Sequence, residues 1–203
     1  MSKGVISIDV DGVLANFTRA FTRLGYQLFK TPVSDNEAQQ FWMFEDFPEL
    51  GLTKVKCAEI WKIIKSDPYF WAELDPLNIS LMHRINSIKN RIFITNRPGI
   101  ATDKQTVAFL ERWGVYEPVV LVAEKKAPVA VEYNVVAHLD DYIVNCEEIK
   151  AALPNAYVAL VAKPYNEAYR YDWQTGPYQG EVVLSADDFF NKCDERGLIE
   201  WAW

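Results

Sequence analysis

Short apolar stretches separated by helical patterns constrain the fold of this chain more than any other feature. The apolar stretches lie at residues 4–9, 91–95, 119–122, 135–139, 156–161 and 181–184. Strands that alternate with helices form parallel sheets, because each helical crossover returns the chain to the same edge. The sequence therefore predicts an α/β fold, a Rossmann-like three-layer sandwich around a central parallel sheet.

The segment between the first two strands has helical patterns and no strand. Asn16 and Thr53 are each placed to cap a helix, and a capping box predicts another helix from Ser34. A block of this length is too long for a simple crossover between neighbouring strands. We therefore expect an inserted helical cap of residues 17–77 and a core domain of residues 1–16 and 78–203.

The first apolar stretch ends in two acids and a glycine, within "VISIDVDGVLANF". Asp9 and Asp11 are poor strand formers and repel each other at close range. Asp-Gly between apolar runs also occurs in hairpins, but here a helix follows Gly12 and no strand pairs back. An EF-hand loop is excluded, because Val13 occupies the fifth loop position, which must supply a ligand. These acids indicate a site at the end of a strand.

Polar residues follow several of the predicted strands. Because ligands of parallel sheets bind beyond the carboxyl ends of the strands, these residues are expected to lie together. They are Asp9 and Asp11 after the first strand, Thr95, Asn96 and Arg97 after the second, Lys125 and Lys126 after the third, and Asp140 and Asp141 after the fourth.

This combination of residue types suits phosphoryl transfer through an aspartyl phosphate. One carboxylate attacks phosphorus, and another protonates the leaving oxygen and later activates water. Clustered carboxylates need a hard cation, and Mg²⁺ suits oxygen ligands and phosphate. A hydroxyl and an ammonium group hold the phosphate oxygens, while Gly12 allows a tight turn beside them.

Four stretches resemble the motifs of the haloacid dehalogenase superfamily, in the same order: "DVDGVLANF", "ITNR", the lysine of "KKAPVA", and "HLDD". The resemblance implies that Asp9 is the nucleophile and Asp11 the general acid/base. It also implies that Thr95 binds phosphate. Asp11 is expected to offer its backbone carbonyl to the metal. The implied Mg²⁺ ligands are Asp9, Asp11, Asp140 and Asp141.

The motif lysine is open between two neighbours. The usual spacing from this lysine to the acid pair favours Lys126, and a loop one residue tighter would select Lys125. We assign Lys126 to the catalytic set and Lys125 to the substrate-binding set. Gly12, Asn96 and Arg97 are also expected to contact the substrate.

The chain is similar to the 5′(3′)-deoxyribonucleotidases within that superfamily, through "DGVLANF", the pair Phe41-Trp42 and "FWAELDP". This resemblance implies a nucleoside monophosphate, with a deoxyribonucleotide favoured, as the substrate. It implies a base pocket lined by Phe17, Phe41, Trp42 and Trp71. Helical spacing instead favours a core position for Trp61. A sugar phosphate or another small phosphoester is the alternative substrate.

Rival functions fit less well. A receiver domain would carry its phosphoacceptor on the third strand, and a silent phosphate-binding protein would not need both Asp9 and Asp11. The net charge of −7 argues against a nucleic-acid polymer as partner. No stretch has the length of a membrane helix, and no signal peptide is visible, so a cytoplasmic protein is expected. The terminal "IEWAW" could pack on its own domain or support a homodimer.

The histidines, the segment at 163–170 and the cysteines have no assigned role in the reaction. His83 and His138 are expected to be structural histidines. "KPYNEAYR" at 163–170 could equally be a plain surface loop or a loop near the active site. The cysteines are odd in number and far apart, which is typical of reduced thiols.

Overall fold

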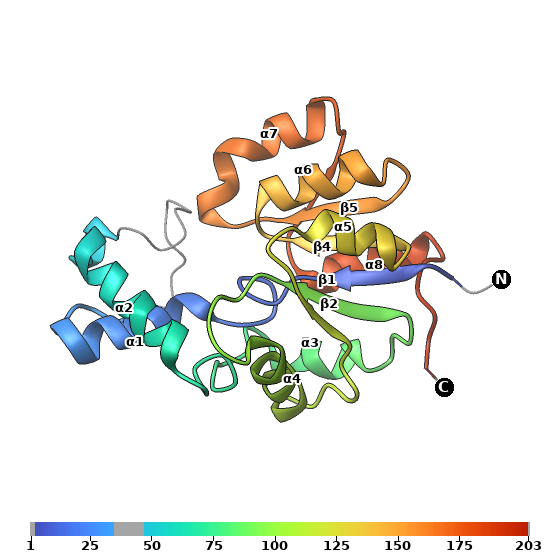
Figure 1. Cartoon of the computed structure of the whole chain (residues 1–203). Coiled ribbons are helices and arrows are strands. Elements are labelled where there is room, and N and C mark those ends of the chain that lie inside the picture. Colours follow the sequence, from blue (N-terminus) through green and yellow to red (C-terminus); the bar gives the residue numbers. More distant parts are fainter. Residues whose placement is uncertain (1–2, 35–46, 203) are drawn as a thin grey trace.

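The computed structural model describes residues 3–34 and 47–202, and it contains one sheet of six parallel strands (Figure 1). The strand order is β3-β2-β1-β4-β5-β6, with every pair parallel. The predicted α/β fold is confirmed. The strands are β1 (Val5–Ile8), β2 (Arg91–Thr95), β3 (Val120–Val122), β4 (Val135–Asp140), β5 (Tyr157–Val161) and β6 (Glu181–Val183).

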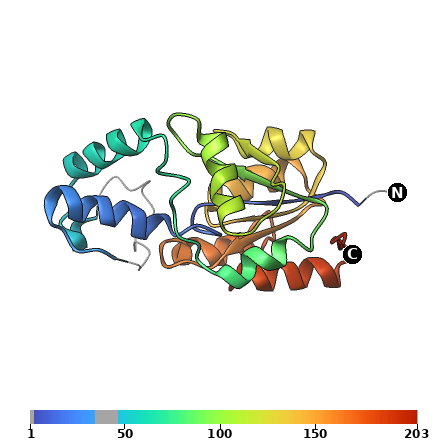
Figure 2. The same ribbon diagram turned by 90° about the horizontal axis from the view of Figure 1, so that it is seen from below.

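Helices cover both faces of the sheet, so the molecule has three layers (Figures 1 and 2). Alternate side chains of a strand point to opposite faces, and in β2 Phe93 enters one apolar cluster while Ile92 and Ile94 enter the other. The Phe93 cluster includes side chains of α3 (Ile79–Ile85), α4 (Thr102–Arg112) and α8 (Ala186–Glu195). The opposite cluster includes side chains of α5 (Lys126–Glu132), α6 (Ile143–Ala152) and α7 (Glu167–Thr175).

The helices that follow β1 project beyond the carboxyl ends of the strands, on the left of Figure 1. They are α1 (Phe17–Phe29), the short 3-10 helix η1 (Pro48–Leu50) and α2 (Lys54–Ser66). The predicted cap of α1 is present, because the Asn16 side chain accepts a hydrogen bond from the Arg19 backbone N–H at 3.0 Å. The helix predicted from Ser34 falls mainly on residues 35–46, which lie outside the described residues.

The segment at 163–170 is helical rather than a loop. It forms the 3-10 helix η2 (Pro164–Asn166) and the start of α7. Among the residues of α7, Trp173 is the buried one. With a single buried side chain, the sequence of α7 gives little basis for distinguishing a helix from a loop.

The C-terminal segment packs on its own domain. Trp201 forms an antiparallel bridge with Ile88, and its indole N–H donates to the Asp194 carboxylate at 2.9 Å. Of the helices in the described ranges, none combines the length and the apolar character that crossing a membrane requires.

Candidate active site

The turn after β1 places two carboxylates at the end of the sheet. The backbone N–H of Asp9 still pairs with β4, donating to the Leu139 carbonyl at 2.9 Å. The chain then reverses at Gly12, whose φ is +74° and whose N–H donates to the Ala15 carbonyl at 3.1 Å. Positive φ is easily adopted only by glycine, so this residue fixes the tight turn that the site needs.

Lys126 joins two of the strand-end carboxylates. Its ammonium nitrogen lies 2.6 Å from Asp9 Oδ1 and 2.7 Å from Asp140 Oδ2. Lys126 is buried, whereas Lys125 is exposed and lines the cavity described below. The structure therefore places Lys126, the residue favoured by motif spacing, against the predicted nucleophile.

Three acidic side chains form a cluster that could hold a cation. Asp9, Asp140 and Asp141 are buried, and each places an oxygen within 4.8 Å of the others. Burial raises the pKa of Asp9 well above its usual value, against the opposing effect of Lys126. Burial and then the neighbouring Asp140 raise the pKa of Asp141 to about 7. Three carboxylates and one ammonium group leave two negative charges, a donor set that fits a divalent cation with oxygen ligands.

Asp140 is fully engaged by the protein. Its Oδ2 accepts from Lys126, from Asn145 at 3.1 Å and from His138 Nε2 at 3.1 Å. Its Oδ1 accepts from the Tyr142 backbone N–H at 2.9 Å and from Asn145 at 3.2 Å. A carboxylate offers about four lone-pair sites, so little capacity remains for a metal. Burial alone would raise the pKa of Asp140, but Lys126 and His138 hold it below its usual value.

His138 is a buried structural residue next to the cluster. Its Nδ1 lies 2.7 Å from Ser7 Oγ, and burial lowers the pKa of the ring. A neutral ring that donates from Nε2 to Asp140 and accepts at Nδ1 from the Ser7 hydroxyl satisfies both contacts. The imidazole thus orients Asp140, in agreement with its predicted structural role.

Asp141 is held from the segment after β5. Tyr165 donates its hydroxyl to Asp141 Oδ2, and the Asn166 amide donates to the Asp141 carbonyl at 2.9 Å. Within the described ranges, no donor to Asp141 Oδ1 is seen, so this oxygen has capacity for a cation. The segment "KPYNEAYR" thus lies near the site, which is one of its two predicted placements, but the sequence analysis singled out neither Tyr165 nor Asn166, because sequence position does not show where side chains point.

Gly12 is also confined by its neighbours. A β-carbon at this position would lie 2.1 Å from Asp141 Oδ2 and 3.0 Å from the Tyr165 hydroxyl. We expect Gly12→Ala to lower the free energy of unfolding by about 1–3 kcal/mol from overpacking, in addition to the cost of positive φ, and to displace Asp141. Thermal unfolding and Mg²⁺ titration by calorimetry measure both effects.

Gly51 supplies the matched control for that substitution. Its φ is +69°, close to that of Gly12, but a β-carbon there would meet nothing within 4 Å. Gly51→Ala should therefore show only the backbone strain, and Mg²⁺ binding should be unchanged. Equal destabilisation in the two variants would contradict the close packing of Gly12 against Asp141.

The Asp11 carboxylate is not part of the cluster formed by Asp9, Asp140 and Asp141. Its carboxylate is bound by Arg97, with Nε to Oδ2 and Nη2 to Oδ1 both at 2.8 Å. Thr95 Oγ1 is 3.5 Å from Asp11 Oδ2, so the predicted phosphate-binding hydroxyl is adjacent. Arg97 is buried and does not line the cavity, which differs from its predicted contact with the substrate. The guanidinium is instead directed at Asp11.

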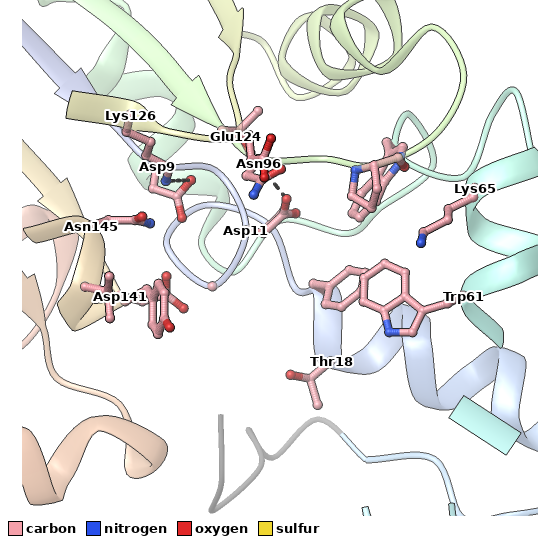
Figure 3. Close-up of a pocket in the computed structure, with 18 of the residues that line it drawn as sticks. Asp9, Asp11, Thr18, Trp61, Lys65, Asn96, Glu124, Lys126, Asp141 and Asn145 are labelled. Carbon is pink, nitrogen blue, oxygen red and sulfur yellow. Dashed lines mark hydrogen bonds and ion pairs between the residues drawn. The ribbon is translucent and has the colours of Figure 1, made fainter. Parts of the chain in front are cut away.

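A cavity of about 1210 Å³ opens between the strand ends and the helices that follow β1 (Figure 3). The residues predicted to be catalytic, Asp9, Asp11, Thr95 and Lys126, all contribute to its lining. Asp140 lies behind it, and Phe41 and Trp42 are outside the described residues. The remaining predicted residues in the lining are Gly12, Phe17, Trp71, Asn96, Lys125 and Asp141.

The far wall of the cavity is aromatic. Phe17 stacks on Trp71 with ring centroids 5.3 Å apart and on Trp61 at 5.5 Å. Trp61 packs on the core, as predicted, but it also lines the cavity, where it faces the open space in Figure 3. Helical spacing could not reveal this second role, because a half-buried indole has the same sequence period as a buried one. Other unpredicted lining residues include Thr18, Lys62, Lys65 and Asn145.

Comparison with known proteins identifies a family for this chain. Residues 3–174 match the family model described as 5′ nucleotidase, deoxy (Pyrimidine), cytosolic type C protein. A search of curated proteins gave no match. The matched range includes the four strand-end motifs and the aromatic segment "FWAELDP".

Solved structures share the fold. A haloacid dehalogenase family hydrolase from Deinococcus radiodurans R1, with bound phosphate and sodium, aligns with a TM-score of 0.63 at 11% identity, over 98% of this chain and 99% of that chain. A haloacid dehalogenase-like hydrolase from Burkholderia xenovorans LB400 aligns with a TM-score of 0.57 at 13% identity, over 96% and 98%. The chain belongs to the deoxy (pyrimidine), cytosolic type C family of 5′-nucleotidases, which are phosphoric monoester hydrolases, and it has the fold of haloacid dehalogenase-like hydrolases.

Proposed function

We propose that this protein is a Mg²⁺-dependent phosphatase that hydrolyses nucleoside monophosphates, preferentially deoxyribonucleoside monophosphates, through an aspartyl phosphate. The observation that carries the proposal is the buried ion pair of Asp9 and Lys126. Both residues line a cavity whose far wall is aromatic. A carboxylate nucleophile and a surface for stacking a planar base thus face the same space. The proposed cap, residues 17–77, contributes Phe17, Trp61 and Trp71 to this wall.

Asp9 and Asp141 are the proposed direct Mg²⁺ ligands, with the Asp11 carbonyl as a further ligand. The ion would neutralise the phosphate oxygens and the surplus charge of the cluster. Asp140 has its oxygens occupied, and its role is to hold Lys126 against Asp9.

Each of the proposed catalytic residues has its own role in the reaction. The Asp9 carboxylate attacks phosphorus as the bond to the leaving oxygen breaks, and Asp11 gives its proton to that oxygen. Thr95 and Lys126 donate hydrogen bonds to the phosphate oxygens as charge develops there. Asp11 then accepts a proton from the water that attacks phosphorus, which frees Asp9 and inorganic phosphate.

The aromatic wall supports a nucleoside as the leaving group. Phe17, Trp61 and Trp71 line the cavity, and base stacking on such side chains is worth about 1–3 kcal/mol per base. Phe41 and Trp42 remain proposed additions to this pocket. The proposed partner is thus a small phosphorylated metabolite, and the proposed cytoplasmic location agrees with the cytosolic type of the matched family.

Phosphate release from a panel of nucleotides and sugar phosphates tests the proposal. We expect nucleoside monophosphates to react with the highest kcat/KM, deoxyribonucleotides above ribonucleotides, and EDTA to abolish turnover until Mg²⁺ is restored. Trp61→Ala should raise KM for nucleotides but not for ribose 5-phosphate. A preference for sugar phosphates with no effect of Trp61→Ala would select the alternative substrate class, and full activity in EDTA would exclude the metal role.

A further inference from the structure

Arg97 makes a two-point contact with Asp11 that no catalytic role in the reaction above requires. Both hydrogen bonds are 2.8 Å long, and the Arg97 side chain is fully buried while that of Asp11 is 21% exposed. A third nitrogen, Nη1, donates to Thr106 Oγ1 at 3.0 Å. A paired guanidinium fixes both the position and the plane of a carboxylate. The Asp11 carboxylate is therefore held by a group that does not reach the cavity.

The faces of the same guanidinium are covered by aromatic rings. Arg97 Cζ lies 4.9 Å from the ring centre of Trp71 and 5.5 Å from that of Phe109. Contacts of this kind add roughly 0.5–2 kcal/mol when they are shielded from water. Trp71 belongs to the cavity wall, so one ring contacts both the substrate space and the residue that holds Asp11.

Trp71 is itself fixed to the loop after β2. Its indole N–H donates to the Pro98 carbonyl at 3.2 Å, and its backbone N–H donates to Gln105 Oε1 at 2.9 Å. The Gln105 amide donates in turn to the carbonyls of Asp67 and Ile100. The end of the inserted segment and the Arg97 loop are thus joined by direct hydrogen bonds.

We propose that Arg97 is a positioning residue for Asp11, and that Trp71 links this position to the inserted helical segment. The inference rests on the proposed role of Asp11 in the phosphatase reaction. Arg97 occupies one side of the carboxylate, and because a carboxylate has about four acceptor sites, others remain for the leaving oxygen and for water. Without Arg97 the carboxylate can rotate away, and a misplacement of about 1 Å costs roughly 10²-fold in rate.

Leaving-group dependence separates this role from direct phosphate binding. A nucleoside alkoxide needs a proton from Asp11 to depart, whereas p-nitrophenolate departs without one. Arg97→Met should therefore lower kcat/KM for deoxyribonucleoside 5′-monophosphates by about 10²-fold and change kcat/KM for p-nitrophenyl phosphate little. Arg97→Lys, which keeps the charge but loses the two-point contact, should fall between wild type and Arg97→Met.

Two further variants test whether the effect of Arg97→Met could come from a loss of fold. Thr106→Val removes the contact that orients Arg97, together with the hydrogen bond from the Thr106 hydroxyl to the Thr102 carbonyl, so it should show the same substrate dependence in weaker form. Arg112→Met is the matched control for Arg97→Met, because Arg112 also lies over a tryptophan ring, that of Trp113, but is exposed and outside the cavity. Its kinetics should match those of wild type with both substrates. Thermal unfolding of every variant checks that each is folded.

A double-mutant cycle decides the mechanism. In an Asp11→Asn background, Arg97→Met should cause no further loss, because Arg97 acts only through Asp11. Additive losses, or equal losses with nucleotides and p-nitrophenyl phosphate together with a raised KM, would show that Arg97 binds phosphate or only supports the fold. Wild-type protein that hydrolyses neither substrate would instead contradict the proposed function itself.

Discussion

Replacing Asp9 with asparagine is expected to abolish phosphate release. Asparagine has nearly the same shape but cannot attack phosphorus as a carboxylate does, and removal of a nucleophile costs at least about 10⁴-fold in kcat. The fold should survive, because burial already works against the charge on Asp9. Single-turnover phosphate release and thermal unfolding measure the two effects separately.

Asp103→Asn is the matched control for that experiment. Asp103 is an exposed acid in the first turn of α4 and does not line the cavity. Its kcat should equal that of wild type. If Asp9→Asn retained activity within tenfold of wild type, Asp9 would not be the nucleophile.

Lys126→Met is expected to impair both stability and catalysis. The lysine is the shared cation of two buried carboxylates, and its loss leaves Asp9 and Asp140 facing each other without compensation. Breaking a buried ion pair in this way costs about 3–5 kcal/mol. Denaturant unfolding should show this loss, and saturating Mg²⁺ should restore part of it. Turnover should remain low even where Mg²⁺ restores stability, because the ammonium group also holds the phosphate.

The neighbouring lysine provides the comparison. Lys125 is exposed at the cavity and has no contact with the carboxylate cluster in the described part of the chain. Lys125→Met should leave the free energy of unfolding unchanged within about 0.5 kcal/mol. A larger loss of stability in Lys125→Met than in Lys126→Met would reverse the assignment of the two lysines.

The sequence predicted the sheet and the meeting point of the acids because both follow from general rules. Apolar stretches separated by helices force parallel pairing, and parallel strands deliver the residues after each strand to one edge. Asp9, Thr95, Lys126 and Asp141 each follow or lie near the end of a strand, so their encounter needed no knowledge of side-chain packing.

Other features depend on side-chain direction, which sequence position does not determine. Arg97 follows Thr95 by two residues, yet it turns away from the cavity because Trp71, Phe109 and Asp11 together surround its guanidinium. Tyr165 reaches Asp141 from a short helix whose polar sequence was compatible with a loop. Both contacts join segments far apart in the chain.

The most direct test of the central claim is to trap the phosphoryl group on the protein. Asp11→Asn protein should be mixed with p-nitrophenyl phosphate that carries a radiolabelled phosphate, because p-nitrophenolate departs without a proton from Asp11, and then quenched in acid and digested. We expect label that hydroxylamine removes, confined to the peptide that contains Asp9, and none in the Asp9→Asn protein. Label on another peptide, or steady phosphate release with no labelled protein at any time, would contradict attack by Asp9.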